Sequence, residues 1–291
     1  MKQDTAPKLT QKPVLSTLVK MAVPMLGGAF AMNAFNLTDT WFVAQLGTIP
    51  LAAMSFSFPV VMLLNSITWG LSTGATAVIS HALGKHDKES ARHITTDTLI
   101  LTTIIVICIT VLGLLTIDEV FIMLGADSTV LPLIREYMTI WYLGIAFMIY
   151  PMMTSDIIRA TGDTVSPSVI MVIVSILNMI LDPIMIFGMF GFPQMGIKGA
   201  ALATVLSRAL SNILMFWILI KRHNLLSICI PKLHNMIASW KKVLEIGLPS
   251  SFTNILVPIS GAIITRIVAA TGAGARLEMF AFMIPMALGV S

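Results

Sequence analysis

The 291-residue chain is 56% hydrophobic and only 11% charged, with a net charge of +4 and a mean hydropathy of +0.90. Soluble domains carry about 25% charged residues, so this composition excludes a soluble globular protein. The apolar runs have the length of helices rather than of alternating strands, which predicts an all-α membrane protein and not a β-barrel. The positive charge lies in short loops, where it sets membrane orientation and does not indicate nucleic-acid binding.

The sequence lacks the patterns typical of disulfide-bonded proteins, metalloproteins, proteins with a cleaved signal peptide and enzymes. Cys108 lies inside an apolar run and Cys229 in a basic loop, so the two cysteines suggest neither a disulfide nor a metal framework. The polar, basic stretch 1–13 is not followed by a short apolar region with a cleavage site, so we expect no removable signal peptide. The chain contains neither a His-Glu-x-x-His nor a Gly-x-Ser-x-Gly pattern, so no enzyme and no cofactor is expected.

Eight apolar segments are separated by Gly- and Pro-containing turns. They run over residues 15–46, 51–83, 93–116, 131–157, 166–190, 198–220, 243–270 and 276–291. This pattern predicts a polytopic helical bundle with one complete six-helix half and the first two helices of a second half.

The predicted organisation has four parts. They are a cytoplasmic tail (1–14), a first transmembrane bundle (15–221), a cytoplasmic linker with a short amphipathic piece (222–242) and an incomplete second bundle (243–291). A weak repeat supports the division, because Pro24 and Gly47 are spaced like Pro249 and Gly272. Transporters are commonly built from such duplicated halves.

The basic residues predict a cytoplasmic N-terminus. With that orientation only Lys198 and Arg276 fall at outer ends, which is a strong positive-inside bias. The residues then placed on the cytoplasmic side are Lys2, Lys8, Lys12, Lys20, Lys85, Lys88, Arg92, Arg159, Lys221, Arg222, Lys232, Lys241 and Lys242.

The first segment contains a single acid, Asp39, within about 30 apolar or small residues, a length that suits a membrane span. A carboxylate there costs roughly 2.5–3.5 kcal/mol on insertion scales and is tolerated when it faces a cavity, a partner or an ion. A buried Asp that holds two helices together is the alternative.

The fifth segment places Asn178 and Asp182 four residues apart, and therefore on one helix face. These oxygen-bearing side chains suit a hard cation or a proton site, or else a polar clamp between helices. Pro183 and Pro24 each remove a helix hydrogen bond and can kink their helices.

Counting along the helices places Asp39, Asp182 and Thr204 in the outer half of the membrane. Two buried acids at one depth repel each other if both are ionised, so they are expected to share a proton, bind a cation or pair with a base. Arg208, one turn from Thr204, is a candidate for that base and so a modulator of the acids, or else a packing residue.

The order and spacing of four motifs resemble the multidrug and toxic compound extrusion (MATE) transporters. The motifs occupy residues 36–47, 159–163, 178–188 and 196–204. The resemblance implies two six-helix bundles around a central cavity and drug export coupled to Na⁺ or H⁺ entry. It also implies that the cation site, with Na⁺ as a candidate metal, uses Asp39, Asn178, Asp182 and Thr204. The family has twelve helices, whereas this chain ends within the eighth, so a truncated product is expected.

The resulting hypothesis is a secondary active transporter of the plasma membrane. Its expected partners are the lipid bilayer and small amphipathic, cationic compounds, and it is expected to work as a monomer. Three alternatives stay open: a lipid-linked oligosaccharide flippase, a membrane-embedded aspartyl-type hydrolase and an inactive fragment. The sequence does not distinguish Na⁺ from H⁺, because carboxylate, amide and hydroxyl oxygens serve either.

Overall fold

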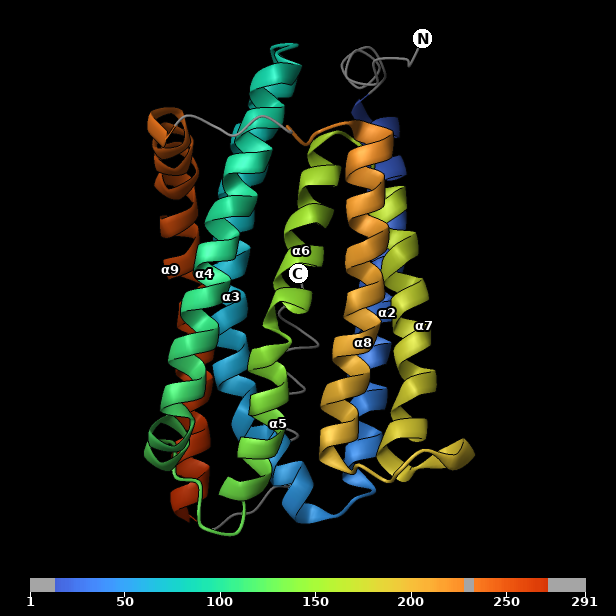
Figure 1. Cartoon of the computed structure of the whole chain (residues 1–291), viewed down its shortest axis with the longest axis vertical. Helices are drawn as coiled ribbons and strands as arrows, with labels where there is room; N and C mark the ends of the chain where they lie inside the picture. Colours follow the sequence, from blue (N-terminus) through green and yellow to red (C-terminus); the bar gives the residue numbers. More distant parts are fainter. Residues whose placement is uncertain (1–13, 228–232, 272–291) are drawn as a thin grey trace.

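A computed structural model of the chain describes residues 14–227 and 233–271, and these residues form a helical bundle (Figure 1). Five of the described helices are long and apolar enough to cross a membrane, or six if the bent pair α5–α6 is one span. The elements are α2 (Val14–Ala44), α3 (Thr48–Gly84), α4 (Lys88–Met123), α5 (Leu131–Leu143), α6 (Ile145–Ala160), α7 (Val165–Phe187), the 3₁₀ turn η1 (Met189–Gly191), α8 (Ile197–Trp217), the π-helical turn η2 (Ile218–His223) and α9 (Leu233–Thr271).

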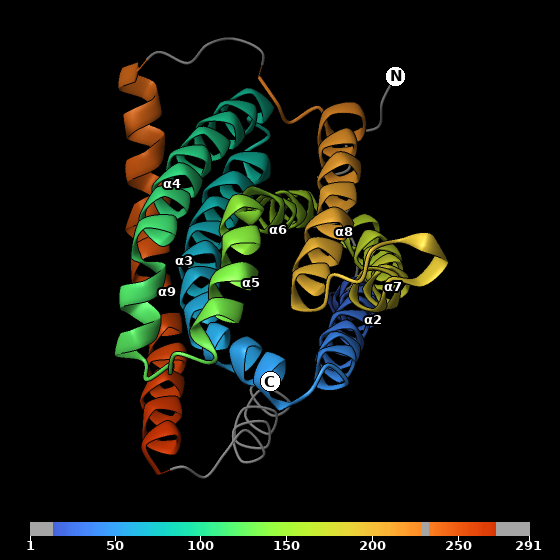
Figure 2. The ribbon, with the colours of Figure 1, turned by 60° about the horizontal axis from the view of Figure 1, so that its bottom comes forward.

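The helices form two groups that are connected by the bent pair α5–α6 (Figure 1). On one side α9 packs along α3, with α4 beside them, and on the other side α7 packs against both α2 and α8. The bent pair lies between the groups, with α6 in contact with both α3 and α8 (Figure 2). The polar residues predicted to form a site therefore belong to the α2–α7–α8 group.

Seven of the eight predicted helical segments have counterparts among the described residues, with two differences. The segment 131–157 is broken at Gly144 by a 48° bend. A Cβ at Gly144 would collide with the side chain of Val205 on α8, so a residue with a side chain would push the two elements apart. The predicted amphipathic piece is not separate, because α9 runs without a break from Leu233 to Thr271. The eighth predicted segment, 276–291, lies outside the described residues.

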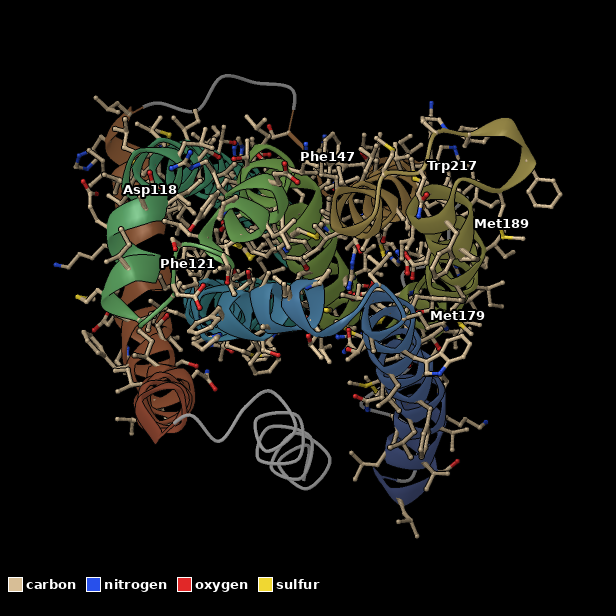
Figure 3. All side chains as sticks on the ribbon, turned by 90° about the horizontal axis from the view of Figure 1, so that it is seen from below. Asp118, Phe121, Phe147, Met179, Met189 and Trp217 are labelled. Carbon is tan, nitrogen blue, oxygen red and sulfur yellow. The ribbon has the colours of Figure 1, made fainter. Side chains whose placement is uncertain are left out.

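The outside of the bundle is apolar, whereas several of its buried side chains are polar. Large hydrophobic side chains such as Trp217 (61% exposed) and Met189 (47% exposed) lie on the periphery of the α7–α8 side (Figure 3). Water would disfavour a surface of this kind, whereas lipid tails accept it. Polar side chains such as Thr95 and Ser168 are buried among the helices instead.

Close packing of α3 against α9 depends on small residues. The backbones approach at Gly70 and Gly74 on α3, opposite Gly247 and Ser251 on α9. A Cβ added to Gly74 would collide with the carbonyl oxygen of Val243. Small residues spaced four apart allow this close approach between membrane helices, where packing rather than water exclusion holds helices together.

We predict that Gly74→Ala destabilises the bundle by about 1–3 kcal/mol, because the added methyl group must displace α9 from α3. Thermal unfolding in detergent measures the effect. The matched control is Gly27→Ala on α2, where an added Cβ has no atom within 4 Å. Equal melting temperatures for the two variants would contradict this account of the helix contact.

A polar cluster joins the α6–α7 turn to η2, which follows α8. The Asp163 carboxylate accepts hydrogen bonds from Ser166 N (3.0 Å), Ser166 Oγ (2.7 Å) and His223 Nε2 (3.2 Å), and it pairs with Arg222 at 3.3 Å. Burial by itself raises the pKa of Asp163, but the hydrogen bonds from His223 and Ser166 and the charge of Arg222 together hold it well below its usual value.

A group whose pKa is depressed by folding stabilises the protein above its unfolded pKa and loses that effect as the pH falls through the folded value. We therefore predict that Asp163→Asn costs roughly 1–3 kcal/mol near neutral pH. The difference from the parent protein should shrink only below about pH 4, near the ordinary pKa of Asp. Melting temperatures across this range test the prediction. Asp118→Asn, which removes an exposed ion pair with Arg135, should cost less than about 1 kcal/mol.

Candidate functional site

Three helices bring the predicted polar residues to one depth, near the end of the bundle where α2 and α7 finish and α8 begins (Figure 1). Asp39 and Asp182 each precede the last residue of their helix by five positions, about 7–8 Å. Thr204 follows the first residue of α8 by seven positions, about 10 Å. The depths expected from the sequence are therefore matched by the helix boundaries.

The turn between α7 and α8 sets the register of these residues. Gly188 ends α7 with a left-handed backbone (φ 73°), and the returning chain donates from Met195 N to Met185 O and from Gly196 N to Ile186 O. At Gly199 the first turn of α8 touches the α7 backbone, since a Cβ there would collide with Met185 O. This contact holds α8 beside the face of α7 that carries Asn178 and Asp182.

The carboxyl and amide groups are withdrawn from the surface. Asp39 is 6% exposed, Asn178 2% and Asp182 0%. With the Asn178 amide oriented to satisfy both of its polar atoms, Nδ2 donates to Asp182 Oδ2 at 2.8 Å and Oδ1 accepts from Thr204 N at 3.2 Å. The structure therefore brings Asn178, Asp182 and Thr204 together by direct contacts.

Two carboxylate oxygens at the site have no hydrogen-bond partner among the described residues, namely Oδ1 of Asp39 and Oδ1 of Asp182. Buried polar atoms are usually paired, and leaving one unpaired costs about 1–3 kcal/mol. Asp39 and Asp182 also repel each other electrostatically when both are ionised. A proton or a bound cation would relieve both costs.

Tyr137 of α5 belongs to the same region and was not predicted from the sequence. Its side chain interacts electrostatically with both Asp39 and Asp182. Tyr137 follows the first residue of α5 by six positions, about 9 Å, so a depth count applied to this segment would have found it. Its hydroxyl is a further polar group within electrostatic range of the two acids.

Arg208 does not pair with either acid, so the predicted charge pair is not found. Its guanidinium lies 5.9 Å from the centre of the Phe35 ring on α2. It lines a cavity between α2, α7 and α8 that also includes Asn178 and Thr204. The cavity and the acidic site thus share two residues. Pro24 and Pro183 lie inside α2 and α7, and both helices continue through them.

The donor set suits a small hard cation or protons. Two carboxylates, an amide and a hydroxyl offer oxygen ligands, the type that alkali and alkaline-earth ions prefer. In the described part of the chain, no three His, Cys, Asp or Glu side chains come together in the manner of a transition-metal site. Together with the apolar exterior, this intramembrane polar site between helices is typical of helical membrane transporters.

The chain belongs to the MatE family, because the family model matches residues 24–184, more than half of its length. It is 37% identical to a FAD transporter of Shewanella oneidensis over 97% of this chain and 64% of that protein. It is 26% identical to the probable multidrug resistance protein NorM of Thermotoga maritima, over 98% of this chain and 62% of that protein. The family membership confirms the resemblance that the sequence motifs indicate.

Solved structures agree with this assignment. The fold matches the bent form of the Vibrio cholerae MATE transporter VcmN with a TM-score of 0.81 at 29% identity, over 98% of this chain and 62% of that one. An outward-facing multidrug resistance MATE transporter matches with a TM-score of 0.79 at 30% identity, over 90% and 56% of the two chains. The chain therefore spans 56–64% of the length of these relatives.

We predict that Gly199→Ala disturbs the site without changing any ligand atom. The added methyl group must move α8 away from Met185 of α7, and Thr204 moves with it. The variant should show a lower melting temperature and a smaller rise in that temperature on addition of Na⁺ or acid. Gly84→Ala, where an added Cβ meets nothing within 4 Å, is the matched control. An unchanged response to ions in Gly199→Ala would contradict the assigned role of this contact.

Proposed function

We propose that this chain is the ion-coupling part of a transporter that exports amphipathic organic compounds in exchange for Na⁺ or H⁺. The observation that carries the proposal is the pair of buried carboxyl groups whose Oδ1 atoms lack partners among the described residues, on two different helices of one site. Membership of a family whose relatives include a multidrug export protein supports the export direction.

The proposed cycle uses the energetic cost of the two acids. When the cavity opens outward, an ion or proton reaches Asp39 and Asp182 and removes their mutual repulsion. Asn178 joins Asp182 to α8 through its hydrogen bonds to Asp182 Oδ2 and Thr204 N, and the hydroxyl of Thr204 is a further oxygen ligand. The Tyr137 hydroxyl lies within electrostatic range of both acids. Neutralisation permits α2 and α7 to repack around Pro24 and Pro183, which biases the bundle between outward and inward states.

We place the protein in the plasma membrane with its N-terminus in the cytoplasm. The ends of α3 and α6 and the starts of α4, α7 and α9 lie at the same end of the bundle as the start of α2 (Figure 1). That end is the one with most of the lysines and arginines, as the positive-inside rule requires of a cytoplasmic side. We expect a monomer that acts on small molecules within the bilayer.

Transport by this chain, extended to twelve helices, tests the coupling. Efflux of a fluorescent cation from vesicles is driven separately by a Na⁺ gradient and by a pH gradient. We predict that Asp39→Asn and Asp182→Asn each reduce gradient-driven efflux at least about tenfold, because each removes a group that must be neutralised to change state. The gradient that drives the parent protein identifies the ion.

The matched control is Asp118→Asn, which changes the same chemical group in an exposed ion pair. It should leave efflux unchanged. If both Asp39→Asn and Asp182→Asn keep the parent rate, the assignment of the coupling site is wrong. The same assay on the 291-residue chain itself decides whether this length is inactive on its own.

Flavin nucleotides are a second candidate for the transported compound. The reason is the 37% identity to a FAD transporter, which handles an anionic dinucleotide rather than a cationic drug. Efflux of FAD and of a cationic dye by the same vesicles separates the two candidates. A lipid-linked oligosaccharide flippase ranks lower, because few basic residues lie inside the spans. An aspartyl-type hydrolase has no support from the family.

A further inference from the structure

The α7–α8 loop (residues 188–196) presents large apolar side chains on the outside of the protein. Phe190 is 85% exposed, and Met189 and Phe192 are exposed beside it. The sequence between Asp182 and Lys198 contains no charged residue. The loop extends sideways from the bundle, away from the other helices (Figures 1, 2 and 3). Exposed apolar clusters of this kind mark a contact with another apolar surface.

The backbone of the loop holds these side chains outward. Phe190 has φ 58° and ψ 28°, a left-handed conformation that bulky residues rarely adopt. The loop also closes on itself, because a Cβ added to Gly188 would lie 2.8 Å from Gln194 N. Phe192 N donates to Met189 O at 3.3 Å across the turn. A ring held outward by an unfavourable backbone indicates that an apolar partner outside the chain accepts it.

Helix length places the loop at the boundary of the bilayer. The 23 residues of α7 extend over about 33 Å, close to the ~30 Å of a hydrocarbon core, and the loop follows directly. Trp41 is exposed three positions before the end of α2, and tryptophan is enriched at membrane interfaces. The neighbouring Phe42 ring meets the Phe187 ring of α7 with centroids 6.1 Å apart. These aromatic side chains mark the depth at which the loop begins.

The loop between α4 and α5 lies at the same end of the bundle and has the opposite chemistry (Figure 1). There Asp127 accepts hydrogen bonds from Thr129 N (2.8 Å) and Val130 N (3.0 Å), and Ser128 is exposed. Asp and Ser in such turns are typical of loops in water. The apolar character is therefore specific to the α7–α8 loop and not general to this end of the protein.

We propose that the α7–α8 loop inserts Met189, Phe190 and Phe192 into the boundary between lipid headgroups and acyl chains, where it anchors the α7–α8 junction. The exposed apolar surface of α7, which includes Ile176 and Ile180, continues along the helix into the loop. Lipid already covers that surface of a membrane helix, so the loop extends an existing contact with the bilayer.

The anchor is built on the turn that sets the register of α7 against α8. Met195 at the end of the loop donates from N to Met185 O, one turn of helix beyond Asp182. Lipid contact at the loop thus fixes the depth of the polar side chains on both helices. This role goes beyond the proposed function and does not rest on it, because it holds for any transported compound and any coupling ion.

The test measures the depth of the Phe190 side chain with a nitroxide label. The label is attached through Phe190→Cys in a 291-residue chain that also carries Cys108→Ser and Cys229→Ser, in phosphatidylcholine nanodiscs. Electron paramagnetic resonance compares collisions with oxygen, which concentrates in the bilayer, and with a water-soluble nickel chelate. The ratio of oxygen to nickel collisions should be at least about fivefold higher than for a label attached through Ser128→Cys.

The two other results both overturn the proposal. A label at position 190 that meets the nickel chelate as often as the label at position 128 lies in water. A label that neither reagent reaches is packed against protein, as in a contact between two copies of this chain. Nanodiscs expose both faces of the bilayer to the reagents, so the result does not depend on the orientation of the chain.

A second measurement tests whether the rings hold the loop in the bilayer. With the label attached through Gln194→Cys, Phe190→Gly combined with Phe192→Ser should raise nickel collisions several-fold. Glycine keeps the left-handed backbone at position 190, so the turn is retained while its ring is removed. Phe190→Leu combined with Phe192→Leu is the matched control and should leave the collisions unchanged. Equal collisions in the two double variants would contradict the anchoring role.

Both measurements are independent of transport. Their failure leaves the coupling assignment of Asp39 and Asp182 standing. Unchanged efflux in Asp39→Asn and Asp182→Asn likewise leaves the lipid anchor standing.

Discussion

The buried pair of carboxyl groups is the constraint on which the rest of this structure depends. Asp39 and Asp182 lie on different helices, both almost fully enclosed, and each has an oxygen without a partner among the described residues. In a medium of low dielectric, two such charges cannot both persist without a proton, a cation or a base. The arginine that lines the adjoining cavity, Arg208, faces Phe35 and not these acids. We propose that a proton or a cation neutralises them.

Small residues allow the helices that carry these polar side chains to pack closely. Gly199 lets α8 touch the last turns of α7, which brings Thr204 within reach of Asn178. Gly74 likewise allows close contact between α3 and α9 on the other side of the bundle. Lipid provides no hydrophobic drive for helices to associate, so close backbone contact and buried hydrogen bonds must supply the cohesion. The polar site therefore rests on packing that a single methyl group can disturb.

Much of the fold could be predicted from the sequence. The backbone N–H and C=O groups of a span must pair with one another inside the bilayer, which requires an apolar helix of membrane length. Six of the predicted segments have their counterparts in α2, α3, α4, α7, α8 and α9. The bend at Gly144 could not be predicted, since a glycine inside an apolar run has many tolerated roles and the deciding contact is Val205 of α8. The continuity of α9 was missed because a polar stretch before an apolar one is typical of a linker.

The sequence by itself determined that this protein spans a membrane, belongs among transporters of its family and carries acids at matched depths in two spans. These follow from composition, helix rise and spacing, which are local properties of the chain. Only the tertiary structure decided which neighbours those acids meet. It placed Tyr137 within electrostatic range of them and Arg208 in the adjoining cavity that also includes Asn178 and Thr204. Rotation of one helix about its axis changes such contacts without altering any depth, so a count along the sequence cannot determine them.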